Sequence, residues 1–207
     1  MEKLSIAQFK KMLAKAAFNI EAAKDELTEL DSQIGDGDHG TTMVKVMNKI
    51  SGTAEAYSGN DFKTLLSEIG MSVLNMGGGA TVPLFGSLFS GMSRAVAEGM
   101  EQLSKDELSE AFKSGEARLL KFSKAPLGAK TLVDSLTPAV AAFDAFEGCD
   151  IADALEAARL AAHEGCMKTK DYVAHFGRAK NLGERAIGIP DPGSVSVSII
   201  FKAFAQS

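Results

Sequence analysis

The sequence predicts an all-α protein, a bundle of about eight helices, and three observations support this fold class. Apolar side chains recur at three- and four-residue intervals in successive segments, the spacing that places them on one face of a helix. The connections between these segments are short and carry capping residues, glycine or proline. The alternation of strands and helices that builds a parallel sheet is absent. With 207 residues, the chain is expected to form a single domain over residues 1–207.

The first predicted helix begins at Ser5, a residue type that caps helix N-termini, and its apolar face extends to Ile20. An acidic loop follows it within the stretch of residues 30–43, and the residues from Gly40 onward are predicted to start the next helix. Helical spacing resumes at Met43, and the pair of residues 51–52, Ser-Gly, is predicted to end this second helix.

A third helix is predicted from Asp61, a candidate N-cap, to the glycine run of residues 77–79. A fourth begins near Pro83, because proline suits the first turn of a helix, and its apolar face continues to Val96. These two helices are therefore joined by a short glycine-rich loop.

Three further helices are predicted in the second half of the chain. The first begins at Ser104, which two acidic residues follow closely, and ends near Lys121. The other two cover residues 131–146 and 150–167, which are rich in alanine and acidic in their first turns, as the helix dipole favours.

The C-terminal segment begins at Ser194, after a loop over residues 177–193 that is rich in glycine and proline. It is predicted to be the last helix of the bundle. Its alternating β-branched residues are equally typical of a strand, so the sequence leaves both interpretations open for this segment.

Composition and charge restrict the classes of partner. The net charge is −5 and the isoelectric point is near 5.3, and no cluster of Lys and Arg favours nucleic acid or an anionic membrane. The two cysteines, Cys149 and Cys166, have no metal-ligand spacing and give no disulfide framework. The chain shows neither a signal-peptide pattern nor an apolar run of about 18 residues. A cytoplasmic location is therefore expected.

Three carboxylates, those of Asp31, Asp36 and Asp38, fall within eight positions of the acidic loop, and glycines alternate with them. At close range each pair would repel by roughly 4 kcal/mol at an effective dielectric of about 20, and a hard divalent cation would relieve that repulsion. A calcium-binding EF-hand loop would need glycine at Thr41 and glutamate at Met47, so Mg²⁺ fits better. The alternative is a solvated Asx-rich turn that caps the next helix.

Two more stretches could bind an anion. Residues 77–81 precede a predicted helix, whose free N–H groups could hold phosphate, although a glycine run between helices is more often a simple C-cap and turn. Near the C-terminus, Arg178 and Arg185 precede the sequence Asp-Pro-Gly at residues 191–193, which could equally form a β-turn with surface ion pairs. No P-loop pattern occurs anywhere in the chain.

Four motifs in fixed order give the chain its resemblance to a known family. They are Leu-Asp-x-x-Ile-Gly-Asp-Gly-Asp-His-Gly, Gly-Gly-Ala-Thr-x-Pro-Leu-Phe-Gly, Lys-Thr-x-x-Asp-x-Leu-x-Pro and Gly-Glu-Arg-x-Ile-Gly-x-x-Asp-Pro-Gly. In this order they resemble the ADP-binding subunit L of dihydroxyacetone kinase over nearly the whole chain. The resemblance implies an antiparallel eight-helix barrel with the nucleotide site at one end.

The same resemblance implies a triose kinase subunit that transfers a phosphoryl group from Mg-bound nucleotide to dihydroxyacetone. It assigns two Mg²⁺ ions to Asp31, Asp36 and Asp38, and catalytic roles to these aspartates and to Arg178. The positions expected to bind ADP or ATP are His39, Gly40, Thr41, Thr42, Gly79, Ala80, Thr81, Gly128, Leu132, Arg178, Asp191, Pro192 and Gly193.

The family also implies partners. The triose is held by a separate subunit K through a covalent link to a histidine. In one branch ADP stays bound as a coenzyme and a phosphohistidine subunit M of the phosphotransferase system recharges it. Other relatives use exchangeable ATP. A free-standing subunit favours the first cycle by analogy.

Departures from the family pattern keep alternatives open. Thr42 replaces a usual Asn, Val82 a usual Gly, and Ala129 and Leu132 a usual Asp and Met. An ATP-dependent kinase of another ketose, such as a tetrose, is one alternative, and a regulatory binding module without transfer activity is another. A third is the nucleotide domain of a fatty-acid kinase, against which His39 argues because a Thr usually stands there.

Overall fold

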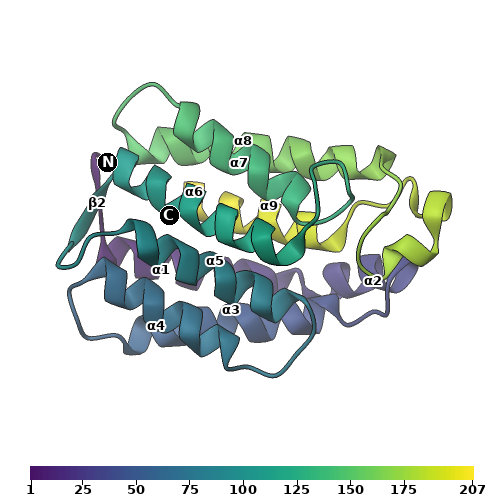
Figure 1. The fold of residues 1–207 in the computed structure, drawn as a ribbon, viewed down its shortest axis with the longest axis horizontal. Helices are drawn as coiled ribbons and strands as arrows, with labels where there is room; N and C mark the ends of the chain where they lie inside the picture. The colour runs from purple at the N-terminus through teal and green to yellow at the C-terminus, as the bar shows by residue number, and fades with distance from the viewer.

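Eight helices of the computed structural model, which describes residues 1–207, close into a ring around an apolar core (Figure 1). In ring order α1, α3, α4, α5, α6, α7, α8 and α9 each pack against the next, and α9 returns to α1. Successive helices run in opposite directions, so the loops alternate between the two ends (Figure 1). The antiparallel eight-helix barrel is confirmed. The ring helices are α1 (Ile6–Ala22), α3 (His39–Ala56), α4 (Phe62–Leu74), α5 (Thr81–Ala95), α6 (Lys105–Ser123), α7 (Val133–Ala145), α8 (Ile151–Lys168) and α9 (Pro192–Ala205).

A ninth helix, α2 (Lys24–Ile34), continues from α1 after a break at Ala23 and packs against α3 and α9. The predicted loop within residues 30–43 is therefore wrong at its start, because residues 30–34 are helical and only residues 35–38 form the loop. Leu27 and Ile34 are buried, and this burial holds α2 in place although its sequence is rich in polar residues.

Helix α3 begins at His39, one residue before the helix start predicted at Gly40, but its predicted end is wrong. The helix continues through residues 51–52, where the sequence predicted that it stops. Gly52 lies on the exposed side of the helix, and two residues later Ala54 is buried in the core. Tertiary packing therefore overrides the local stop signal.

A two-stranded antiparallel sheet was not predicted. Strand β1 (Lys3–Ser5) pairs with β2 (Gln102–Ser104), and the buried residues Leu4 and Leu103 stand opposite each other. Each strand ends in a serine that caps the following helix, and both Ser5 and Ser104 form capping boxes. These predicted caps are confirmed, and Asp61 likewise caps α4 by accepting from the N–H of Thr64.

The C-terminal segment is helical, so the strand interpretation is wrong. Helix α9 begins at Pro192, two residues before the predicted start, with Asp191 as its N-cap. Val197, Ile200 and Phe201 are buried in the core. Their three- and four-residue spacing shows that burial against the barrel interior, rather than β-propensity, decides this segment.

The barrel axis is filled by apolar side chains. A cavity of about 50 Å³ on this axis is lined only by hydrophobic residues of α1, α3, α5, α6, α7 and α9. The barrel interior therefore offers a polar ligand no polar partner. None of the helices combines the length and the apolar character that a membrane crossing requires.

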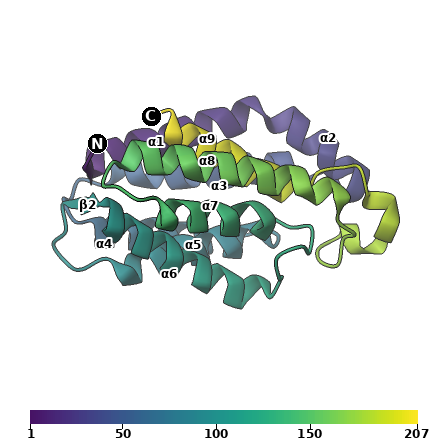
Figure 2. The ribbon, with the colours of Figure 1, turned by 90° about the horizontal axis from the view of Figure 1, so that it is seen from above.

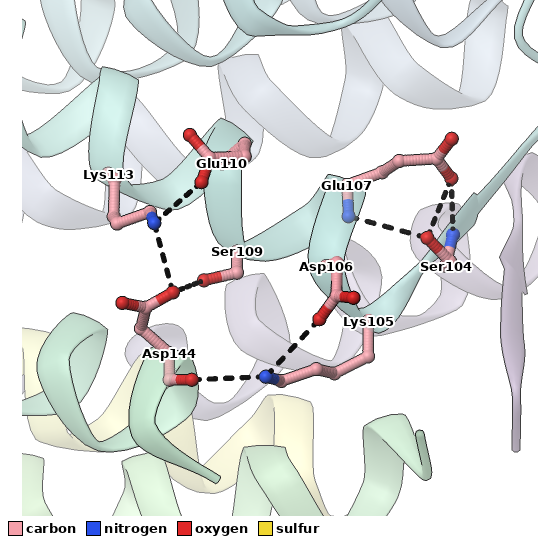
Figure 3. Close-up of polar contacts among 8 residues, drawn as sticks. All are labelled: Ser104, Lys105, Asp106, Glu107, Ser109, Glu110, Lys113 and Asp144. Carbon is pink, nitrogen blue, oxygen red and sulfur yellow. Dashed lines mark hydrogen bonds and ion pairs between the residues drawn. The ribbon is translucent and has the colours of Figure 1, made fainter. Parts of the chain in front are cut away.

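Polar contacts join α6 to α7 at the barrel end that holds both chain termini (Figures 1 and 3). The buried Lys105 donates to the backbone carbonyl of Asp144 at 3.0 Å, close to the C-terminal end of α7. The Asp144 carboxylate accepts from the hydroxyl of Ser109 at 2.6 Å and pairs with Lys113 at 3.0 Å. These contacts hold α6 and α7 together at this end of the barrel.

Candidate functional site

All four sequence motifs lie at the barrel end opposite the chain termini. The connections α2–α3, α4–α5, α6–α7 and α8–α9 emerge there, because successive helices alternate in direction (Figures 1 and 2). Figure 2 shows the α8–α9 connection next to the end of α2. The antiparallel topology therefore gathers segments that are far apart in the sequence.

The three predicted metal-binding aspartates converge. One carboxylate oxygen from each of Asp31, Asp36 and Asp38 lies within 4.8 Å of the other two. Asp31 is partly buried in the last turn of α2, whereas the other two lie in the exposed loop before α3. The donor set consists only of carboxylate oxygens, which is the set that Mg²⁺ or Ca²⁺ prefers.

Asp31 also organises the start of α3. Its Oδ2 atom accepts from the backbone N–H groups of Asp38 at 2.9 Å and His39 at 3.1 Å. A carboxylate from α2 thus caps α3, while the side chain of Asp38 makes no capping bond. Gly35 lies beside it, and a Cβ there would lie 2.2 Å from Asp31 Oδ1, so a larger residue would displace this carboxylate. Gly37 has φ +74°, which favours glycine as well.

Arg178 reaches the same cluster from the α8–α9 connection. Its Nη1 atom lies 2.7 Å from Asp36 Oδ2. The arginine side chain is 69% exposed, and exposed ion pairs of this kind contribute little stability. Arg178 is therefore held near the aspartates by a contact that a phosphate could replace.

The His39 side chain links the start of α3 to α9. Its Nε2 atom lies 2.8 Å from the hydroxyl oxygen of Ser196, and that hydroxyl donates to the carbonyl of Pro192. Because the serine proton is used in this way, the hydroxyl oxygen accepts from His39, and the neutral ring carries its proton on Nε2. Burial lowers the pKa of His39, and the charge of Asp31 opposes this shift.

Gly40, the last residue of the first motif, and the two threonines after it lie in the first turn of α3. Gly40 is buried against α2, Thr41 is exposed and Thr42 is partly buried. Thr42 donates its backbone N–H to the carbonyl of Asp38. These residues directly follow Asp38 in the sequence. They belong to a helix start, where free N–H groups favour an anion.

The glycine run of residues 77–79 forms the α4–α5 connection, as predicted, and α5 begins at Thr81. The cap position is Ala80, which has no side-chain acceptor for the first N–H groups of the helix. Gly79 and Ala80 are exposed. No hydrogen bond joins the α4–α5 connection to the other three connections. It shares only the same end of the barrel with them.

The α6–α7 connection is shaped by Asp134, which was not among the predicted site residues. Its two carboxylate oxygens accept from the N–H groups of Gly128 and Thr131. Gly128 has φ +87°. Leu132 lies beside Gly193 at the start of α9, since a Cβ on that glycine would be 3.1 Å from the leucine Cβ. Asp134 is the Asp of the Lys-Thr-x-x-Asp motif, and its place in that motif was the one sequence feature that could have indicated its role in shaping this connection.

Asp191 accepts from the backbone N–H of Ser194 at 2.7 Å, and so caps α9. Burial raises the pKa of Asp191 to about 7, and the negative charge of Asp134 adds to this rise. The hydrogen bond from the Ser194 N–H and the positive charge of Lys130 lower the pKa and so oppose the rise. Pro192 and Gly193 are the first residues of α9. The structure therefore places all three residues at a helix start, not in an isolated β-turn.

Asp191→Asn should remove part of the pH dependence of stability. The folded wild type holds this proton up to about pH 7, whereas the unfolded chain releases it near pH 4. The contribution to the free energy of unfolding is therefore full below about pH 4 and is lost as the pH rises to about 7, with a slope of at most about 1.4 kcal/mol per pH unit. Asparagine keeps the cap but does not titrate.

Urea unfolding of both proteins from pH 4 to pH 8 measures this difference. The wild type should lose stability relative to Asp191→Asn as the pH rises through this window. A constant difference between the two proteins would show that Asp191 titrates at its ordinary pKa.

Comparison with known proteins gives a family match. The model of the DAK2 domain family matches residues 33–206 of the chain. The ADP-binding subunit DhaL of the PEP-dependent dihydroxyacetone kinase of Escherichia coli K12 is 33% identical over 204 residues, covering 98% of this chain and 97% of the relative. The ADP-binding subunit DhaL of PEP-dependent dihydroxyacetone kinase 1 of Listeria innocua is 34% identical over 188 residues, covering 91% and 89%.

A solved structure has the same fold. The crystal structure of the dihydroxyacetone kinase from C. freundii in complex with AMP-PNP and Mg²⁺ aligns with a TM-score of 0.75 and 25% identity, over 95% of this chain. The alignment covers 33% of that kinase chain. The present chain therefore spans about a third of the solved kinase.

Proposed function

The chain belongs to the DAK2 domain family, and on that premise we propose that it is the ADP-binding subunit of a dihydroxyacetone kinase. In this role it is a phosphotransferase subunit that acts on an alcohol group. The observation that carries the proposal is the convergence of Asp31, Asp36 and Asp38 at the barrel end where α3 and α5 begin.

The three carboxylates fit a magnesium site. Their donor atoms are all oxygen, they lie close together, and Arg178 is the one cation paired with them. We propose two Mg²⁺ ions there, because a charge of +4 exceeds that of three carboxylates and leaves a positive balance for nucleotide phosphates. Bound Mg²⁺ would offset the charge on the transferred phosphoryl group.

The nucleotide is proposed to lie across the four connections. His39, Gly40, Thr41 and Thr42 would face the phosphates from the first turn of α3, and Arg178 would contribute a charged contact to the reacting phosphate. The remaining lining residues are proposed to be Gly79, Ala80, Thr81, Gly128, Leu132, Asp191, Pro192 and Gly193. Phosphoryl transfer then depends on positioning and electrostatics.

Two partner subunits are proposed. The relatives are named both ADP-binding and PEP-dependent. ADP can serve such a kinase only if a phosphoryl group reaches it from another donor. We propose a phosphohistidine subunit M for that step and a sugar-binding subunit K for the acceptor. Tight retention of ADP as a coenzyme follows from this cycle.

Thermal unfolding of the protein freed of bound nucleotide, with and without Mg·ADP, tests the proposal. A ligand at 100 times its Kd adds about 2.7 kcal/mol to stability, which should raise Tm by roughly 5–10 °C in a chain of this size. Mg²⁺ alone and ADP with EDTA are the controls, and both should give much smaller shifts. An unchanged Tm at saturating Mg·ADP would contradict nucleotide binding. Mass spectrometry of the purified protein would show whether ADP is retained.

A further inference from the structure

The α8–α9 connection is a loop whose two ends are tied together. It leaves the barrel at Thr169 and returns at Asp191. The N–H of Gly188 donates to the carbonyl of Lys170 at 2.7 Å, and the N–H of Asp191 donates to the hydroxyl of Thr169 at 2.9 Å. We call residues 169–170 and 188–191 the neck of this loop.

Lys130 enters the neck from the α6–α7 connection. It is 1% exposed, and its ammonium group donates to the carbonyls of Thr169 at 2.5 Å and Ile189 at 2.6 Å. One of these carbonyls lies on each side of the neck. The backbone of Lys130 has φ +60°, which residues other than glycine rarely adopt. The side chain therefore bonds to both sides of the neck from a third segment.

The loop beyond the neck has a small apolar cluster of its own. Ala174, Ala179 and Ala186 pack with Ile34, the last residue of α2. Ile34 lies two residues before Asp36, and Arg178 directly precedes Ala179. The position of Arg178 thus depends on how the loop rests on α2, since its ion pair with Asp36 is exposed and weak.

We infer that Lys130 is a positioning residue for the proposed phosphotransfer: its ammonium group holds the neck closed and thereby keeps Arg178 at the aspartate cluster. The inference rests on the proposed function. A carbonyl that loses its donor away from water is costly, and here one ammonium group donates to two carbonyls. The Thr169 carbonyl also accepts from the Tyr172 N–H at 3.3 Å. The partly buried Ile189 carbonyl therefore depends more on Lys130. Replacing it with an apolar side chain leaves both carbonyls without this partner, so the neck opens.

Calorimetric titration of the nucleotide-free proteins with Mg·ADP tests the link to Arg178. Lys130→Met and Arg178→Ala should each weaken binding about tenfold or more, and the double variant should bind no more weakly than the weaker single variant, because both changes remove the same contact. A purely structural role for Lys130 would lower Tm and leave the Kd of the folded protein unchanged. Wild-type affinity in Lys130→Met, or losses that multiply in the double variant, would overturn the inference.

Lys124→Met is the matched control. Lys124 lies in the same connection and also has positive φ, but its side chain is exposed. This variant should bind Mg·ADP like the wild type. If Lys130→Met does not fold, Lys130→Gln, which keeps one donor group, takes its place in the titration.

Limited trypsin digestion tests the neck without nucleotide. The loop offers cleavage sites at Arg178, Lys180 and Arg185. Cleavage there should be several-fold faster in Lys130→Met than in the wild type or Lys124→Met, and equal rates would overturn the neck role. Failure of the wild type to bind Mg·ADP would instead overturn the proposed function, so the two failures are distinguishable.

Discussion

The Asp36→Ala variant should lose phosphoryl transfer while its barrel stays folded. The substitution removes one of three proposed metal ligands and the partner of Arg178. Metal stabilisation of a transferred phosphoryl group is worth several kcal/mol, so a loss of about 10³-fold or more in kcat/KM is expected. Asp36 lies in an exposed loop outside the apolar core, and Tm without nucleotide should therefore change by only a few degrees.

Formation of dihydroxyacetone phosphate, measured with a sugar-loaded partner subunit and a phosphoryl donor, gives the rate. The Mg·ADP-dependent rise in Tm should disappear as well. Glu29→Ala is the control, because Glu29 is an exposed carboxylate on α2 outside the aspartate cluster. Retained turnover in Asp36→Ala would refute the metal role, and global unfolding would refute the independence of loop and core.

Gly40→Ala should damage both stability and nucleotide binding. A Cβ on Gly40 would lie 2.2 Å from the carbonyl oxygen of Lys24 and 2.4 Å from the hydroxyl of Thr28. The carbonyl oxygen of Lys24 belongs to α2, so it can move away from this Cβ only if α2 is displaced. Asp31 lies on the same helix and would be displaced with it. Overpacking of this kind costs about 1–3 kcal/mol, and a displacement of about 1 Å in a site can cost roughly 100-fold in rate.

Gly52→Ala provides a control on the same helix. No atom lies within 4 Å of a Cβ at Gly52, and alanine in an exposed helix interior stabilises by about 0.5–1 kcal/mol relative to glycine. Urea unfolding should therefore move in opposite directions for the two variants, and titration with Mg·ADP should show weaker binding only for Gly40→Ala. Equal stability and affinity in Gly40→Ala and the wild type would show that α2 and α3 separate without cost.

The errors in the predicted elements have a common cause. Residues 51–52 and 30–34 carry local signals for a helix end and a turn, but both stretches are helical. Ala54 beyond the first and Ile34 at the end of the second are buried. Burial of an apolar side chain outweighs the fraction of a kcal/mol by which helix propensities differ.

The residues that support the site were not predicted for a different reason. Asp134 and Lys130 belong to a recognised motif, but nothing in the motif shows that one shapes its own loop and the other bonds to the α8–α9 neck. Ile34 resembles any apolar residue at a helix end, and only the loop that packs on it gives it a role. The role of each of these residues depends on the segment that it contacts in the folded chain, and the sequence does not show which segment that is.

The sequence by itself determined the fold class, most helix positions, the caps at Ser5, Asp61 and Ser104, and the family. These features depend on the spacing of residues within a short segment or on the order of the motifs, and both can be taken directly from the sequence. Only the tertiary structure decided that Arg178 meets Asp36, that Lys130 enters the neck and that β1 pairs with β2. Those contacts join segments far apart in the sequence, and they exist because the eight-helix ring closes.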